Sequence, residues 1–309
     1  PGLGRPTYPA DLMAATFTQL PTTVSERPGF LRRAATAIRQ DWLALVGLIV
    51  IVIVLAMAVF GPWLAPAPGD GSGLINVDER MQAPSAEHLF GTDWLGRDVL
   101  SRVILGARIA VQVSVIVVGL AILIGVPLGA IAGYYRGWLD ELIMRITDLF
   151  LAFPPLLLAM AIVAALGPGL QNATLALVVS WWPWYTRIAR GLAVSLREWP
   201  FVDAARAMGI RETTIIFRHI VPNSIGPIVV QATIDIGTVI LAAGGLAFIG
   251  LGARPPAPDW GLMVAEGRQF ILDQWWIATF PGLAIFFTVL AFNLVGDLLL
   301  RLLDPRQED

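Results

Sequence analysis

The 309-residue sequence contains no cysteine and no lysine, because all 21 basic residues are arginine. Without cysteine there are no disulfides, thiolate metal ligands or cysteine nucleophiles. Without lysine there is no Walker-A lysine, so the chain cannot hydrolyse ATP through a P-loop of its own. Charge is also sparse, at 14% of residues, compared with about 25% in an average soluble domain. Too few charges are present to cover a water-exposed surface.

Histidine is nearly absent too, and the two histidines, His88 and His219, are expected on opposite faces of a membrane. The sequence has no H-E-x-x-H or G-x-S-x-G motif, so it lacks the usual catalytic groups of metallohydrolases and serine hydrolases. The net charge of −2 gives no concentrated basic face for nucleic acid. We therefore expect no catalytic residue, no metal site and no cofactor on this chain, and no nucleic-acid partner.

Apolar residues make up 56% of the chain, and the mean hydropathy is +0.71. Runs of about 20 apolar residues are long enough to cross a bilayer. We expect an all-α integral membrane protein with about six transmembrane helices, at residues 42–64, 109–132, 149–166, 172–185, 225–251 and 275–295. Pro154 and Pro155 predict a kink in the third. The tryptophans at 181, 182 and 184 predict that the fourth ends at the interface, as an aromatic belt. A vestibule lined by these tryptophans is the less favoured alternative.

Six spans would place both termini on one side of the membrane. Fifteen arginines fall in segments on that side and six on the other, so the positive-inside rule predicts that the termini are cytoplasmic. The expected organisation is a cytoplasmic N-terminal extension (1–41), a first transmembrane helix (42–64), an extracytoplasmic segment (65–108), a five-helix core (109–305) that includes a loop at 187–222, and a cytoplasmic tail (306–309).

A polar segment between the fourth and fifth spans is the first candidate functional region. It reads E-W-P-F-V-D-A-A-R-A-M-G-I-R-E-T-T-I-I-F-R-H-I-V-P-N over 198–223 and predicts two short helices that separate at Gly209. Asp203 lies in the first turn of the first helix, where an acid is favoured by the helix dipole. Ala204 and Ala205 give this helix a surface small enough to enter a partner's groove. By physics alone, an ordinary interfacial helix is the more common alternative.

The same segment resembles the EAA loop of permease subunits in binding-protein-dependent ATP-binding-cassette importers. The resemblance rests on D-A-A-x-x-x-G at 203–209, followed at the family's spacing by H-I-V-P at 219–222. Asp203, His219 and Val221 replace the usual glutamate, isoleucine and leucine. The resemblance implies that the loop docks into an ATPase subunit, with the coupling residues Asp203, Ala204, Ala205, Met208, Gly209 and Glu212.

Three further segments resemble the second permease subunit of the dipeptide, oligopeptide and nickel branch of this family. They read H-L-F-G-T-D-W-L-G-R-D-V-L-S-R-V-I-L-G-A-R at 88–108, G-Y-Y-R-G-W-L-D-E-L-I-M-R at 133–145 and L-A-F-P-P-L-L-L-A at 151–159. Ala110 stands where a serine is usual. The resemblance implies a heterodimer with a homologous second permease, two ATPase subunits that bind ATP and Mg, and an external substrate-binding protein, all at the bacterial cytoplasmic membrane.

Asp93, Arg97 and Asp98 lie in the turn-rich part of the expected outer segment. Read with the family, they are candidates for an external gate or for docking of the binding protein. Read physically, the Gly-Asp pairs form turns and Asp98 caps a helix that starts at Val99, which is the favoured interpretation.

Asp235 is the one acid well inside an expected span, and an acid there should face protein or water because lipid exposure is costly. Gln231, Asp235 and Thr238 fall at i, i+4 and i+7, on one stripe of one helix. Two interpretations stay open: a polar pore lining that meets the amino end of a peptide, or an acid hydrogen-bonded between helices.

The function that the resemblance implies is one half of the translocation pore of an ATP-driven importer for di- or oligopeptides, delivered by an external binding protein. A nickel or nickel-chelate importer permease is the first alternative, because the motifs are similar. An ion-coupled secondary transporter is the second, but the sequence shows no persuasive internal repeat. An intramembrane enzyme lacks a catalytic constellation.

Overall fold

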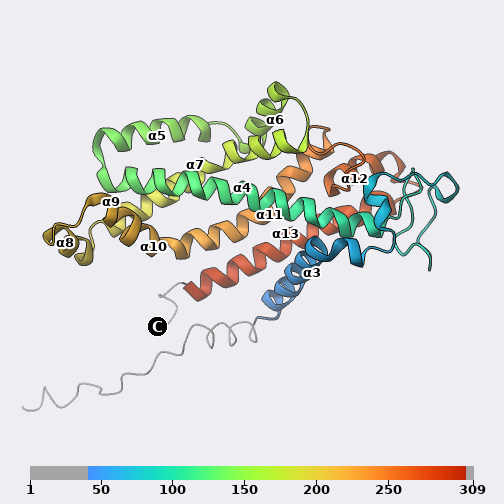
Figure 1. Cartoon of the computed structure of the whole chain (residues 1–309), viewed down its shortest axis with the longest axis horizontal. Coiled ribbons are helices and arrows are strands. Elements are labelled where there is room, and N and C mark those ends of the chain that lie inside the picture. Colours follow the sequence, from blue (N-terminus) through green and yellow to red (C-terminus); the bar gives the residue numbers. More distant parts are fainter. Residues whose placement is uncertain (1–40, 304–309) are drawn as a thin grey trace, which may run out of the picture.

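The computed structural model of the chain describes residues 41–303, which form a bundle of long helices (Figure 1). Four described helices are long and apolar enough to cross a membrane: α3 (Trp42–Leu64), α4 (Val99–Tyr135), α11 (Ile225–Phe248) and α13 (Trp276–Leu303). A bent pair, α5 (Gly137–Leu151) and α6 (Pro155–Leu166), adds a fifth if it counts as one span. Residues 1–40 of the expected extension and the tail 306–309 lie outside the described residues.

The expected third span, 149–166, is not one kinked helix. The chain breaks between Leu151 and Pro155, and α5 and α6 meet at 83°. Pro155 occupies the first turn of α6, where its missing N–H has no helical acceptor to lose. Consecutive prolines therefore end one helix and begin another here.

The expected fourth span, 172–185, was placed too short, because α7 runs from Leu170 to Leu196. The tryptophans expected at its end lie in its middle, and Pro183 is accommodated inside it. Helix α7 is long enough to cross a membrane, but it carries too many polar and aromatic residues to count as an apolar span. It is nevertheless buried among α4, α6 and α11, so its surroundings in the bundle are largely protein.

Helix α4 is the central element, and its 37 residues extend about 55 Å at 1.5 Å per residue, well beyond the ~30 Å hydrocarbon core of a bilayer. It packs along α7 through Gly125, Gly129 and Gly133, which are spaced one turn apart. A Cβ atom on these glycines would lie 2.5, 2.2 and 2.5 Å from the carbonyl oxygens of residues 182, 186 and 190. The two backbones therefore touch along more than two turns.

The short elements gather at the two ends of the bundle (Figure 1). At one end lie α8 (Pro200–Ala207), α9 (Glu212–Ile215), a π-helical turn (Ile216–Ile220) and α10 (Val221–Asn223). At the other end lie the irregular segment 65–98, which includes the 3-10 turns Pro68–Ser72 and Val77–Glu79, and α12 (Trp260–Gly267) with its following turn Arg268–Phe270. The start of α3 and the end of α13 lie toward the α8 end of the bundle (Figure 1).

Candidate functional site

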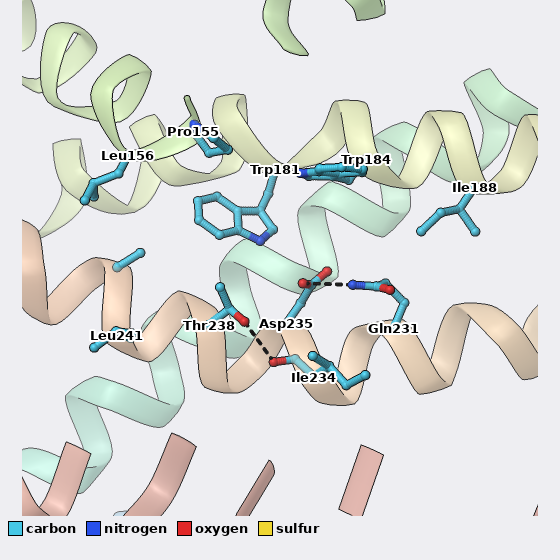
Figure 2. Close-up of a pocket in the computed structure, with 11 residues that line it drawn as sticks. Pro155, Leu156, Trp181, Trp184, Ile188, Gln231, Ile234, Asp235, Thr238 and Leu241 are labelled. Carbon is cyan, nitrogen blue, oxygen red and sulfur yellow. Dashed lines mark hydrogen bonds between the residues drawn. The ribbon is translucent and has the colours of Figure 1, made fainter. Parts of the chain in front are cut away.

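A cavity of about 750 Å³ opens between α6, α7 and α11 (Figure 2). Its walls are mainly aliphatic and aromatic, with a few polar side chains from α11. The lining residues are Pro155, Leu156, Trp181, Trp184, Ile188, Gln231, Ile234, Asp235, Thr238, Leu241 and Ala242. An apolar cavity of this size with few polar groups has the properties of a small-molecule site.

The structure brings the three residues of the expected polar stripe, Gln231, Asp235 and Thr238, to this one cavity. The Gln231 amide donates a hydrogen bond to Asp235 Oδ1 at 3.1 Å. The Thr238 hydroxyl instead donates to the carbonyl of Ile234 at 3.3 Å (Figure 2). Thr238 is exposed, whereas Asp235 is 7% exposed. Asp235 is therefore the buried polar centre of the cavity.

Asp235 Oδ2 is buried, and the Tyr185 hydroxyl and the Trp181 indole nitrogen are the donors beside the carboxyl group, although neither makes a hydrogen bond of good geometry to Oδ2. The Tyr185 hydroxyl is buried as well, and the Asp235 carboxyl group is the acceptor beside it. Trp181 directs its indole nitrogen toward Asp235 (Figure 2). Every polar neighbour of the carboxyl group, on α7 and α11, is thus a neutral side chain.

Trp181 and Trp184 were expected to anchor the fourth span at the membrane interface, and Trp181, Trp184 and Ile188 instead line the cavity. These three residues fall at i, i+3 and i+7 of α7, one face of a continuous helix. That spacing is readable in the sequence once α7 is taken beyond Tyr185. The expected end of the fourth span at Tyr185 obscured it.

At the α8 end, the residues expected to contact an ATPase divide into two groups. Asp203, Ala204, Met208, Gly209 and Glu212 are exposed, and Met208 is 71% exposed. Gly209 has φ +72°, a conformation that favours glycine, and its hydrogen atoms face open space. This glycine is therefore required by the turn between α8 and α9, not by a close neighbour.

Ala205 does not belong to the exposed group, and its assignment to a docking surface needs correction. It is 3% exposed and packs with Val202, Ile215 and Ile216 in a core that also includes Tyr134 of α4. Because the Ala205 side chain is small, α8 can pack closely against this core. Ala205 thus positions α8, and Ala204 is the alanine that this structure leaves open to a partner.

Tyr134, which the sequence did not single out, ties α8 to the end of α4. The guanidinium groups of Arg197 and Arg206 lie 5.7 and 5.2 Å from the centre of its ring, within the range of a cation–π interaction. Arg206 Nε also donates to the Tyr134 hydroxyl at 3.3 Å, and Arg197 donates to the Tyr134 carbonyl at 2.7 Å. Three elements, α4, α7 and α8, therefore meet at one side chain.

At the opposite end, Asp93 and Arg97 belong to a buried charge cluster with Arg102 and Glu266. Arg97 Nε lies 2.7 Å from Asp93 Oδ2, Arg102 lies 3.0 Å from the same oxygen, and Glu266 lies 3.3 Å from Arg97. Both arginine side chains are 1% exposed. Burial raises the pKa of Glu266, and the charge of Arg97 opposes that effect. The cluster fastens the segment before α4 to α12.

Asp98 caps α4, as the sequence predicted, since its carboxylate accepts from Ser101 N at 2.7 Å. Its other oxygen lies 3.1 Å from His88 Nδ1. Gly96 beside it has φ +76°, and a Cβ atom there would lie 1.8 Å from the carbonyl oxygen of Asn76. Within residues 41–303, no group of three or more His, Asp or Glu side chains could hold a metal ion.

A solved structure shares this helical arrangement. It is described as "Inward facing conformations of the MetNI methionine ABC transporter", and the match has a TM-score of 0.54 at 20% identity, covering 66% of this chain and 97% of the other. At that identity the likeness concerns the fold. The chain is thus a multi-pass α-helical membrane protein with the fold of an ABC-transporter chain.

Sequence comparison identifies the family. Residues 125–309 match the family "Binding-protein-dependent transport system inner membrane component", and residues 29–84 match "N-terminal TM domain of oligopeptide transport permease C". The dipeptide transport system permease protein DppC of Alkalihalophilus pseudofirmus is 47% identical over 277 residues, 90% of each chain. The glutathione transport system permease protein GsiD of Shigella boydii is 43% identical, over 87% of this chain and 88% of that one. The chain therefore belongs to the family of binding-protein-dependent transport system inner membrane components.

Proposed function

We propose that this chain forms one half of the translocation pore of an ATP-driven importer for di- or oligopeptides in the bacterial cytoplasmic membrane. The observation that carries the proposal is its 47% and 43% identity, over nearly the whole of both chains, to permeases named for dipeptide and glutathione transport. The cavity between α6, α7 and α11 supports it, because the chain offers a partly polar chamber inside a largely apolar bundle.

The energy for transport would come from other subunits, because the chain has no lysine for a P-loop. We assign the exposed surface of Asp203, Ala204, Met208, Gly209 and Glu212 as the contact with an ATPase subunit. The complex would contain two such ATPases with their ATP and Mg, a homologous second permease and an external substrate-binding protein.

Movement at α8 has a direct route into the membrane-spanning part. Arg206 of α8 and Arg197, which follows α7, both hold Tyr134 at the end of α4. The glycine contacts then join α4 to α7, and α7 forms one wall of the cavity. A displacement of α8 caused by an ATPase subunit would therefore be transmitted to the cavity wall through packed helices.

The α8 end would face the cytoplasm together with both chain termini, in agreement with the arginine distribution. The segment 65–98 would then face the binding protein. We assign Asp93, Arg97 and Asp98 a positioning role there, since their side chains are buried and hold this segment on α4 and α12. The docking surface for the binding protein would be built on the segment that they fix.

Reconstitution tests the function directly. The chain, its partner permease, both ATPases and the binding protein are assembled in proteoliposomes, and uptake of a labelled dipeptide is measured. We expect uptake that needs both ATP and the binding protein. Dipeptide uptake without ATP, or ATP hydrolysis by this chain alone, would contradict the proposal.

Neighbouring alanines test the coupling surface. Ala204→Arg adds bulk and charge at an exposed position, so ATPase subunits should no longer co-purify while the permease keeps its normal abundance in the membrane. Ala204→Ser, which stays small, should retain the ATPases. Ala205→Arg forces a charge into the core around Tyr134 and should reduce abundance itself. Normal co-purification and uptake with Ala204→Arg would remove this surface from the interface.

A further inference from the structure

The carboxyl group of Asp235 is a buried acid that lacks a cationic partner within the described chain. The cavity has no basic residue in its lining, and the groups beside the carboxyl group are the neutral side chains of Gln231, Trp181 and Tyr185. Oδ1 accepts from Gln231, and Oδ2 lies buried beside the neutral Tyr185 and Trp181 donors. A carboxylate in this position is stabilised only in part.

Two arginines of α7 that are close in sequence to the cavity residues are already paired. Arg187 and Arg190 flank the lining residue Ile188, but each pairs with an acid on α5. Arg187 lies 2.6 Å from Asp148, and Arg190 makes two hydrogen bonds to Asp140, at 2.6 and 2.7 Å. A bidentate pair of this kind holds the guanidinium group firmly. Neither arginine therefore neutralises Asp235, whose charge is left for a group outside residues 41–303.

The surroundings of the carboxyl group suit an ammonium group. Acids inside membrane-spanning helices are normally paired with a cation or serve a ligand. Trp181 and Trp184 line the same cavity, and the face of a tryptophan ring attracts cations better than that of other aromatic side chains. The volume of about 750 Å³ is within the range of sites that take small organic molecules. Its remaining walls are apolar and would tolerate different side chains.

We propose that this cavity binds the primary ammonium group of the peptide cargo, with the Asp235 carboxylate as the acceptor and Trp181 and Trp184 beside it. The inference rests on the proposed function, and it assigns the cargo's charged amino end to a defined side chain of the permease. Gln231 orients the carboxyl group through its hydrogen bond to Oδ1. The apolar walls then hold the rest of the cargo without selecting its sequence.

The charge preference of the cavity can be measured with charged thiol reagents in place of cargo. Because the chain contains no native cysteine, a single introduced cysteine is its only thiol. Thr238→Cys places one thiol on the exposed lining residue that follows Asp235 by one turn. In the assembled complex, its rates of reaction with a trimethylammonium-ethyl and a sulfonatoethyl thiosulfonate reagent are compared. We expect the cationic reagent to be favoured, and Asp235→Asn to reduce that ratio by roughly tenfold.

Matched variants separate charge from shape. Asp235→Glu should keep the cation preference, whereas the isosteric Asp235→Asn should lose it. Leu272→Cys, at a residue that is 93% exposed and lies after α12, should show a reagent ratio that does not respond to Asp235→Asn. A ratio at position 238 that stays the same with Asn would overturn the proposal, because a hydrogen-bonded structural acid predicts that result.

Transport by the reconstituted complex gives the second readout. With the unmodified binding protein at saturation, Asp235→Asn should slow uptake of a dipeptide with a free amino end by roughly tenfold, the scale of one lost charge-assisted hydrogen bond. Asp235→Glu should restore much of the rate, and Thr233→Val, on the same helix but outside the cavity lining, should leave it unchanged. If the unaltered complex imports no peptide, the proposed function fails, while the reagent ratio still reports on the cavity. Normal uptake with Asp235→Asn contradicts this inference alone.

Discussion

The contact between α4 and α7 leads to a sharp prediction at Gly129. An added Cβ atom would lie 2.2 Å from the carbonyl oxygen of Thr186 and 2.8 Å from the Cβ of Ala189. Carbon and oxygen atoms in close backbone contacts are normally about 3.3–3.6 Å apart. Gly129→Ala therefore requires the two helices to separate by about 1 Å. Overpacking of this kind costs about 1–3 kcal/mol.

Gly119 supplies a control on the same helix, because a Cβ atom there would have no neighbour within 4 Å. Both substitutions replace glycine with a better helix former, a gain of up to about 1 kcal/mol each. The difference between the two variants cancels this gain and leaves the packing cost. We expect Gly129→Ala to be less stable than Gly119→Ala by about 1–3 kcal/mol.

The assay is thermal unfolding of each variant in the same detergent, followed by the loss of a monodisperse species. At about 2–4 °C per kcal/mol for larger chains, Gly129→Ala should unfold roughly 2–12 °C below Gly119→Ala. Gly129→Ala should also reduce uptake if α4 and α7 must move together. Equal unfolding temperatures for the two variants would refute the close backbone contact.

Two more substitutions test the opposite end of the bundle by the same assay. Asp93→Asn removes the charge shared by two buried arginines. It should lower the free energy of unfolding by about 3–5 kcal/mol, because it leaves a buried charge uncompensated. Stability within about 0.5 kcal/mol of the parent would show that the cluster is not needed for folding. Trp260→Phe removes the indole donor 2.9 Å from the Val103 carbonyl and should cost about 1 kcal/mol, whereas Trp63→Phe, at a residue 79% exposed, should cost little. An equal effect of the two would contradict a specific role for the indole hydrogen bond.

The helical membrane fold could be predicted from sequence because lipid requires long apolar helices, and α3 has the expected bounds, Trp42–Leu64. The errors fell where packing inside the bundle replaces lipid. Around Trp181 and Pro183, polar and helix-breaking residues are surrounded by α4, α6 and α11, so hydropathy ended the span too early. The kink expected at Pro154 and Pro155 is a break with an 83° change of direction between α5 and α6, and hydropathy carries no information on direction.

Helical periodicity predicted which residues of α11 share a face, and Gln231, Asp235 and Thr238 do line one cavity. It did not reveal the opposite wall, because α7 was not recognised as continuous. For α8, Val202 and Ala205 are both buried at i and i+3, a pattern that the sequence contains but that a family motif centred on two alanines conceals. The role of Tyr134 depends on residues 63 and 72 positions away, which no local pattern reports.

Helix α7 explains how the two distant regions can work together. It carries Trp181 and Trp184 at the cavity and ends at Leu196, after which the chain enters α8 within four residues. An uninterrupted helix transmits displacement along its axis, and the backbone contacts at Gly125, Gly129 and Gly133 make α4 part of the same rigid unit. Helix α6 packs on α7 and shares a hydrophobic core with α4 and α7, so the wall at Pro155 and Leu156 belongs to this unit as well. A displacement of α8 would therefore carry Trp181 and Trp184 together with the α6 wall of the cavity.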